Sequence, residues 1–423
     1  MTKQKINLCN SLFYMLGVFT TIQLLSIEGI TVFNIVLILT AVIPSIINSK
    51  KLRMDKFFAF SVPATLVTLL LSIINRSLTS GFKSSAITEG IIYIMILTAY
   101  LLMNTKEKYA VNLVKGFKFS CGLTLGWCVL QLIFFYLVHI DINVLVFENF
   151  LKISGARSDY LNGVLIPSGF YLHRAILMPS LIFMFFSIKN PYLMMLIIII
   201  GCLTKSTALI IGLLLALVFR IIIIIIVNTE NLHRKIGRKK IILALSIVLI
   251  IAIGCVALNS KISELASYVV TRFTDATTNK ADNSSVVHFW YYKNLIPILK
   301  KMDLKSILFG TGFGTSGQHY TWFNGQYLDL ESWVVESDYI NILLSQGIIG
   351  LVLWEYVFLK LIILSKRYKF WENIAFVVII AFVGIMYNIQ FIWFIVIELG
   401  MLVLTKKKIR VFDVAEKKWR NKL

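Results

Sequence analysis

Near its C-terminal third the chain reads Phe309-Gly310-Thr311-Gly312-Phe313-Gly314 and, further on, Glu336-Ser337-Asp338-Tyr339-Ile340-Asn341. The run that follows ends in Leu343-Leu344-Ser345-Gln346-Gly347-Ile348-Ile349-Gly350. Glycines at alternate positions indicate a tight turn, because glycine tolerates the positive φ angles that such turns need. The segment therefore combines a turn, an acidic loop and the start of an apolar helix, and the sequence on both sides of it is mostly apolar.

The composition is typical of a membrane protein. Hydrophobic residues make up 58% of the 423 residues, charged residues make up 15%, and the mean hydropathy is +0.82. A soluble core cannot bury that much apolar surface. We therefore predict an all-α, polytopic integral membrane protein with one membrane domain (1–423) and about 12 transmembrane helices. The predicted spans are 8–27, 30–47, 57–74, 86–103, 119–139, 169–188, 192–203, 208–227, 241–258, 339–364, 374–387 and 389–404.

The basic residues occupy alternate loops between these spans. Lysine and arginine in short loops stay on the cytoplasmic side of a membrane, so both termini are predicted to be cytoplasmic. The net charge of +21 then reflects contact with anionic lipid and does not indicate a nucleic-acid partner. The basic loops contain Lys50, Lys51, Arg53 and Lys56; Lys106, Lys108, Lys115 and Lys118; Arg234, Lys235, Arg238, Lys239 and Lys240; and Lys366, Arg367 and Lys369.

Neither a metal nor a nucleotide cofactor is predicted. All five cysteines fall inside predicted spans, and no spacing typical of zinc or disulfides occurs. The dinucleotide-binding pattern is matched by Gly312-Phe313-Gly314-Thr315-Ser316-Gly317. The match is not significant, because the sequence predicts neither a strand before it nor a helix directly after it.

Two predicted outer segments, 140–168 and 259–338, are too long to be simple connections, so function is expected there. The larger one is predicted to be partly helical. Ser260 is a candidate cap for a first helix, and Asp282, Asn283 or Ser284 for a second helix in which Pro297 could form a kink. Apolar residues of the second helix recur at helical spacing, namely Val286, Phe289, Ile296 and Leu299.

Several basic residues lie at or near the predicted outer membrane boundary. Ionisable groups are costly there, and arginine binds phosphate oxygens in a bidentate manner, so the set is a candidate site for a lipid diphosphate. The alternative is that each side chain reaches lipid headgroups or pairs with Asp159 or Asp275. The candidates are Arg157, Arg174, Lys205, Arg272 and His288.

Acidic and aromatic residues complete the candidate site. A carboxylate can take a proton from an attacking hydroxyl, and flat aromatic faces suit the C–H side of a sugar. The candidate catalytic residues are Glu336 and Asp338, and the candidate glycan-binding residues are Trp322, Tyr327 and Trp333. A solvated loop is the alternative. The turn glycines Gly310, Gly312 and Gly314 serve either a tight turn or the close approach of a diphosphate to bare amides.

From Asp303 to Gly350 the sequence resembles the O-antigen polymerase and ligase superfamily. In that superfamily a glycine turn precedes a helix start written approximately His-Asn-x-Tyr-Leu-x-x-Leu-x-Glu-x-Gly-x-x-Gly, to which Tyr339, Ile340, Leu343, Gly347 and Gly350 conform. The histidine and asparagine positions are Glu336 and Ser337 here, which is similar to the acidic version in repeat-unit polymerases of the Wzy type.

The resemblance implies a glycosyltransferase at the outer face of a bacterial plasma membrane. It would move a growing glycan from undecaprenyl diphosphate onto a new lipid-linked repeat unit, with the basic residues on the diphosphates and Glu336 or Asp338 as the base. Its partners would be polyprenyl-diphosphate-linked oligosaccharide, membrane lipids, and a flippase and chain-length regulator of the same pathway. The alternatives are an O-antigen ligase, which the missing histidine disfavours, and a flippase or other transporter, for which repeated halves would be expected.

Overall fold

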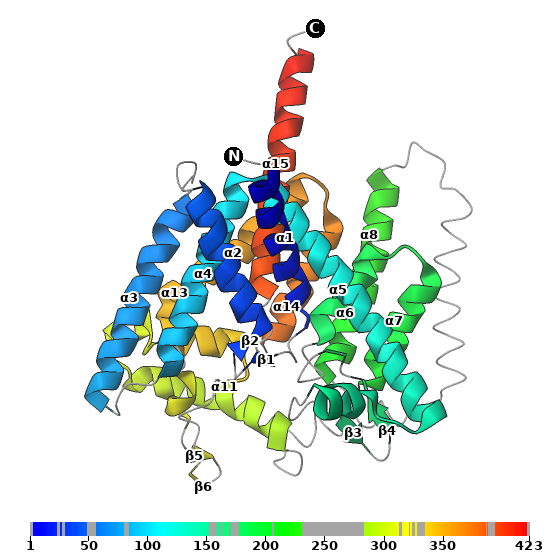
Figure 1. The fold of residues 1–423 in the computed structure, drawn as a ribbon. Helices are drawn as coiled ribbons and strands as arrows, with labels where there is room; N and C mark the ends of the chain where they lie inside the picture. The colour runs from blue at the N-terminus through cyan, green and yellow to red at the C-terminus, as the bar shows by residue number, and fades with distance from the viewer. Residues whose placement is uncertain are drawn as a thin grey trace.

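A computed structural model was obtained for the whole chain. The structure describes residues 3–22, 26–27, 30–48, 56–79, 84–151, 159–161, 164–167, 169–170, 177–204, 207–230, 283–312, 315–320, 322–323, 326–327, 335–385, 387 and 394–420. Within these residues the fold is helical apart from three two-stranded antiparallel hairpins (Figure 1). The helices follow the apolar runs of the sequence, as expected for segments that satisfy their backbone hydrogen bonds internally in lipid.

The first half of the chain supplies eight α-helices in the order in which they occur. They are α1 (Lys3–Phe19), α2 (Val32–Asn48), α3 (Lys56–Thr79), α4 (Ser84–Thr105), α5 (Glu107–Ile133), α6 (Leu177–Ser187), α7 (Pro191–Leu203) and α8 (Thr207–Glu230). The second half supplies α11 (Asn283–Lys301), α12 (Leu304–Phe309), α13 (Asp338–Arg367), α14 (Trp371–Gly384) and α15 (Ile395–Arg420).

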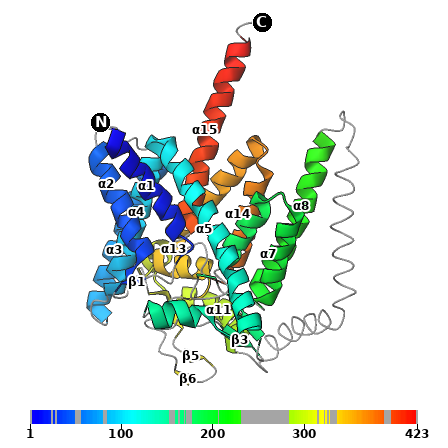
Figure 2. The same ribbon diagram turned by 45° about the vertical axis from the view of Figure 1, so that its right-hand side comes forward.

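The two ends of the chain lie on the same side of the helix bundle, at the top of Figures 1 and 2. On the opposite side lie α11 and the short hairpins β3–β4 and β5–β6 (Figure 1). The hairpins pair Asp159–Leu161 with Val164–Ile166 and Trp322–Phe323 with Gln326–Tyr327, and a third pairs Ser26–Ile27 with Ile30–Thr31. The segments predicted as outer loops therefore lie opposite the termini wherever the structure describes them.

The helices have the apolar character of a multi-pass membrane protein. Three are long and apolar enough to cross a bilayer, over Glu107–Val138, Leu209–Val227 and Asp338–Arg367. Shorter apolar helices cover Asn7–Phe19, Val32–Asn48, Gly90–Thr105, Leu177–Ser187, Pro191–Leu203 and Trp371–Gly384. The predicted span at 241–258 and the predicted helix after Ser260 lie outside the described residues, so the number of about 12 spans remains a prediction.

Two expectations about the helices were wrong in detail. Lys108, Lys115 and Lys118 do not belong to a loop, because α5 begins at Glu107 and all three lysines lie on its exposed surface. Long lysine side chains can extend from such a helix towards water, so their charge does not end the helix. The predicted sixth span also starts too early: Gly169 has a φ of 64° in a turn, and α6 begins only at Leu177.

The second helix predicted in the large outer segment is present as α11, which begins at Asn283 and includes Pro297. The smaller outer segment contains a π-helical turn, Val144–Phe150, followed by the hairpin β3–β4. Both segments predicted as outer loops therefore contain helices or strands within their described residues.

Helices α1 and α5 pack so closely that their backbones are in contact. A methyl group on Gly17 would overlap the backbone of Leu113 and Phe117, and one on Gly116 would overlap the backbone of Tyr14. Close approach through small residues is a common way to pack helices in membranes, where no hydrophobic force drives association. Phe13 of α1 also stacks on Tyr109 of α5, with ring centroids 4.6 Å apart.

Candidate functional site

The glycine turn follows directly from the short helix α12. Asp303 caps this helix by accepting a hydrogen bond from the amide of Ser306. Gly310 then ends the helix with a φ of 75° and a ψ of 177°, and Gly312 has a φ of 109°. Both conformations are rarely accessible to residues with a side chain. Gly314 lies outside the described residues.

Helix α13 bends sharply at Gly347, where φ is 70° and ψ is −174°. The bend divides the helix into an outer arm, residues 338–346, and an inner arm, residues 348–367. The sequence predicted one continuous span here, because apolar residues continue on both sides of Gly347. A glycine-only conformation within a long helix separates them.

The glycine turn and the bend of α13 interlock through their backbones. The amide of Thr311 donates to the carbonyl of Leu344 at 2.9 Å, and that of Gly312 donates to Ser345 at 2.8 Å. A methyl group on Gly310 would overlap the backbone of Ser345, and one on Gly347 would overlap α12. The turn therefore supports the bend, and these two amides already donate within the protein.

The outer arm of α13 starts between the two candidate catalytic carboxylates. Ser337 is the N-cap residue and accepts from the amide of Ile340. Glu336 precedes the cap and is exposed, whereas Asp338 follows it and is fully buried. A helix N-terminus stabilises negative charge in its first turn. The two carboxylates are thus close together in the chain, but Glu336 is exposed to solvent and Asp338 is buried.

Helix α11 lies against this helix start. The hydroxyl of Tyr292 is 2.8 Å from that of Ser337 and also donates to the carbonyl of Ile385. Burial raises the pKa of Tyr291 to about 12, and the negative charge of Glu336 contributes to this increase. Burial also raises the pKa of Tyr292, and the charge of Asp338 adds to it. Both tyrosines therefore remain neutral hydrogen-bonding groups beside the carboxylates.

Side-chain hydroxyl groups form a hydrogen-bond network next to the glycine turn. Ser316 donates to the side-chain oxygen of Asn341 at 2.6 Å and accepts from the amide of Val335 at 3.2 Å. The hydroxyl of Thr311 is 2.7 Å from that of Thr315 and 3.0 Å from Nε2 of His319. Burial lowers the pKa of His319 to about 4, so its imidazole is neutral at physiological pH.

This network could not be predicted from the sequence. Ser316 and Asn341 lie in separate motifs, and only the tertiary structure shows that they meet and hold the loop before Glu336. Three aromatic rings close the same region, since Tyr320 lies 4.9 Å from Tyr291 and 5.1 Å from Trp290 between ring centroids.

The structure describes only part of the predicted binding residues. Arg157, Arg174, Lys205, Arg272 and Trp333 lie outside the described residues. His288 belongs to α11, and Trp322 pairs with Tyr327 across the hairpin β5–β6, but their side chains are outside the described part. Among the predicted site residues, Gly310 and Gly312 therefore contact the outer arm of α13 around Ser345, whereas Glu336 and Asp338 flank its N-cap residue Ser337. Within the described residues no group of His, Cys, Asp or Glu is arranged to hold a metal ion.

Comparison with known proteins adds no assignment. No protein-family model matches the chain, and no curated protein matches it. The case for a function therefore depends on the residues and their arrangement.

Proposed function

We propose that the protein is a membrane glycosyltransferase of the Wzy type, which polymerises lipid-linked repeat units at the outer face of a bacterial plasma membrane. The observation that carries the proposal is an exposed carboxylate, Glu336, beside the capped start of α13. Tyr292 contacts this helix start from α11, which lies on the side opposite both termini (Figure 1). The ring of Tyr291 lies near this carboxylate, and its pKa is raised by burial and by the charge of Glu336. The motif resemblance from Asp303 to Gly350 supplies the reaction class.

In the proposed reaction the acceptor sugar hydroxyl attacks the anomeric carbon of the donor glycan. Glu336 takes the hydroxyl proton as the new C–O bond forms. The bond between the anomeric carbon and the diphosphate breaks, and undecaprenyl diphosphate leaves with the electron pair. Arg157, Arg174, Lys205 and Arg272 are proposed to balance the charge of the leaving group, since preorganised cations act most strongly on charge that develops in the transition state.

The two carboxylates have different proposed roles. Glu336 is exposed and can reach a sugar hydroxyl, whereas Asp338 has no exposed surface. We assign Glu336 as the general base and Asp338 as a positioning residue in the first turn of α13. As the buried first residue of α13, it fixes the start of the arm directly after Glu336 and the N-cap residue Ser337.

The test is Glu336→Gln, which preserves size and polarity but cannot accept the proton. Loss of a general base costs roughly 10²- to 10⁴-fold in rate, so single lipid-linked repeat units should accumulate in cells. The matched control is Glu372→Gln, which changes another exposed carboxylate close to a helix start, in the first turn of α14. This control should leave glycan length unchanged.

The same assay distinguishes the alternatives. Glycan length on the lipid carrier would be measured together with access by an external glycosidase. Long chains that remain on the carrier in the Glu336→Gln strain would indicate a ligase and would refute the polymerase proposal. Single units that the glycosidase cannot reach would indicate a transporter instead.

A further inference from the structure

The chain turns back on itself where α5 ends. Helix α5 continues into a π-helical turn, Phe134–Val138, and His139 ends this turn with a φ of 58°. A second π-helical turn, Val144–Phe150, follows within a few residues. It lies at the end of the bundle opposite both termini, beside the hairpin β3–β4 (Figures 1 and 2). Residues 139–151 are named the return segment.

The return segment packs against α5 at a point well before the end of that helix. Trp127 of α5 donates from Nε1 to the side-chain oxygen of Asn143 at 2.8 Å. The same ring contacts Phe147, with ring centroids 5.7 Å apart. At a rise of about 1.5 Å per residue, Trp127 precedes Val138 by about 16 Å along the helix. Helix side chains also tilt towards the N-terminus. The return segment therefore folds back along α5.

This part of α5 has the length and composition of a membrane span. Phe119–Val138 contains no charged residue, and Lys118 precedes it. A helix of about 20 apolar residues spans a hydrocarbon core of about 30 Å. With Phe119–Val138 in that core, the contacts at Trp127 lie inside the membrane and not in the water beyond it.

The return segment has buried residues on one side and exposed apolar residues on the other. The buried residues are Ile142, Asn143 and Phe147. The exposed apolar residues are Ile140, Leu145, Phe150 and Leu151. Its two acidic residues, Asp141 and Glu148, are half-buried. This division is typical of an amphipathic segment at a membrane interface. Phe150 is 80% exposed, and clustered apolar side chains of this kind mark a contact surface for membrane or protein.

The exposed apolar residues continue the lipid-facing surface of α5. Exposed side chains recur along one face of α5, at Phe119, Leu123, Leu130, Ile133 and Leu137. An apolar helix face that no other helix covers is turned towards lipid in a bilayer. Leu137 is 76% exposed and lies two residues before the turn at His139. The lipid-facing surface of α5 therefore leads directly into the return segment.

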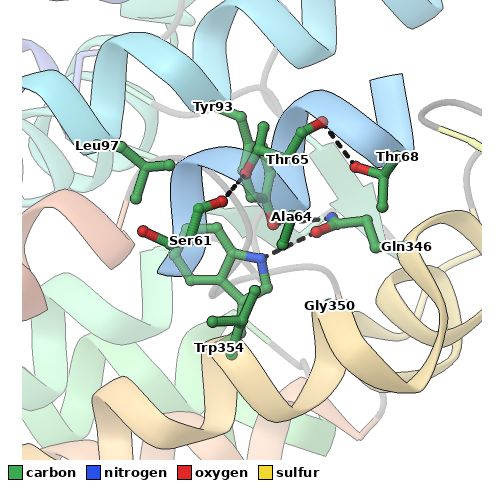
Figure 3. Close-up of a pocket in the computed structure, with 10 residues that line it drawn as sticks. Ser61, Ala64, Thr65, Thr68, Tyr93, Leu97, Gln346, Gly350 and Trp354 are labelled. Atoms are coloured by element: carbon green, nitrogen blue, oxygen red, sulfur yellow. Dashed lines mark hydrogen bonds between the residues drawn. The ribbon is translucent and has the colours of Figure 1, made fainter. Parts of the chain in front are cut away.

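A cavity between α3, α4 and the bend of α13 has no room for lipid. Tyr93, Gln346 and Trp354 line it (Figure 3), and its volume of about 10 Å³ admits about one water molecule. Its polar side chains bond to one another, since Gln346 donates to Tyr93 at 2.8 Å. A lipid chain cannot enter this cavity, so contacts with lipid belong to the exposed surfaces.

We propose that the return segment is inserted in the membrane, and that its exposed apolar residues contact the acyl chains of the leaflet at that end of the bundle. Asn143 keeps its hydrogen bond to Trp127 in this position, so insertion does not strand that polar group. The segment 140–168, predicted from the sequence as an outer loop, would then begin within the membrane. The proposal does not depend on the proposed glycosyl transfer.

The experiment is site-directed spin labelling of the full chain in liposomes of phosphatidylethanolamine and phosphatidylglycerol. A nitroxide is attached to Phe150→Cys in a background with Cys202 and Cys255 replaced by alanine; the remaining cysteines are buried. Power saturation measures access of oxygen, which concentrates in acyl chains, and of a polar nickel chelate, which stays in water. Leu130→Cys on α5 is the lipid reference, and Lys305→Cys, at an exposed position of α12, is the water reference.

The ratio of oxygen to nickel access for the Phe150→Cys label should match that of the Leu130→Cys label. It should exceed that of the Lys305→Cys label by about tenfold or more, because unpaired polar groups are costly to transfer into hydrocarbon. A ratio equal to that of Lys305→Cys would place Phe150 in water and overturn the proposal. Low access of both reagents would show that protein covers this position, and would overturn it as well.

A second labelled position keeps the test decisive. Leu145→Cys replaces Phe150→Cys if the latter gives no monodisperse size-exclusion peak, and the same ratio is expected for it because Leu145 belongs to the same exposed set. A Leu145→Cys label that reports water would contradict insertion in the same way.

Discussion

Replacement of Gly347 by alanine tests whether the bend of α13 depends on its contact with the glycine turn. The φ of 70° and ψ of −174° lie in a region that is essentially restricted to glycine, so an alanine there costs about 1–3 kcal/mol. Its methyl group would also overlap the backbone of Leu308 and Gly310, which cannot rotate away. Overpacking of this kind adds about 1–3 kcal/mol. We expect a total of about 3 kcal/mol or more from these two effects.

Purified Gly347→Ala protein should therefore show a lower Tm than wild type in detergent, measured from the loss of the monodisperse size-exclusion peak on heating. Gly126→Ala is the matched control, because Gly126 lies within α5 and a methyl group there would meet nothing within 4 Å. Alanine is favoured over glycine inside a helix by about 1 kcal/mol, so this control should be neutral or slightly stabilising. A Gly347→Ala protein with a wild-type Tm would refute the interlocked bend.

Other consequences can be tested in parallel. Phosphatase fusions after Gly317 should be active and fusions after Arg238 inactive; the reverse would place the candidate site on the cytoplasmic side. The pKa of His319 is lowered to about 4, so below about pH 6.5 the unfolded chain takes up a proton that the folded protein does not. Stability should thus fall as the pH decreases from about 6.5 to about 4, and a Tm that is equally pH-dependent in His319→Gln would contradict this. Gln346→Leu removes the side-chain oxygen that accepts from Trp354, and an unpaired buried N–H costs about 1–3 kcal/mol, which a Tm measurement would detect.

The sequence predicted the helices best where one apolar run is bounded by polar residues. The expected span 208–227 corresponds to α8, and the expected span 192–203 corresponds to α7, which Asn190 caps. The prediction from sequence failed where an apolar run contains a break in the helix, as it does in α13. Hydropathy cannot distinguish a straight helix from the bent α13, because the bend needs the turn at Gly310 from another part of the chain.

The candidate site was predicted in part for the same reason. Residue type indicated a group of carboxylates in this loop, and the motif resemblance at the helix start favoured Glu336 and Asp338 among them. Their different exposure could not be predicted, because it depends on how α11 covers the start of α13. The contact of Ser316 with Asn341 was missed because uncharged polar residues have no distinctive spacing and the two lie in different segments of the chain.

The contact between α1 and α5 has a consequence for biosynthesis. Gly17 of α1 fits against the backbone of Leu113, and nearly a hundred residues of chain separate them. At translation rates of about 5–20 residues per second, α5 leaves the ribosome roughly 5–20 s after α1. During that interval α5 does not yet cover the backbone of α1 at Gly17, which then faces the translocon or lipid. The close contact between α1 and α5 can therefore form only after α5 is made, and α1 meets other neighbours until then.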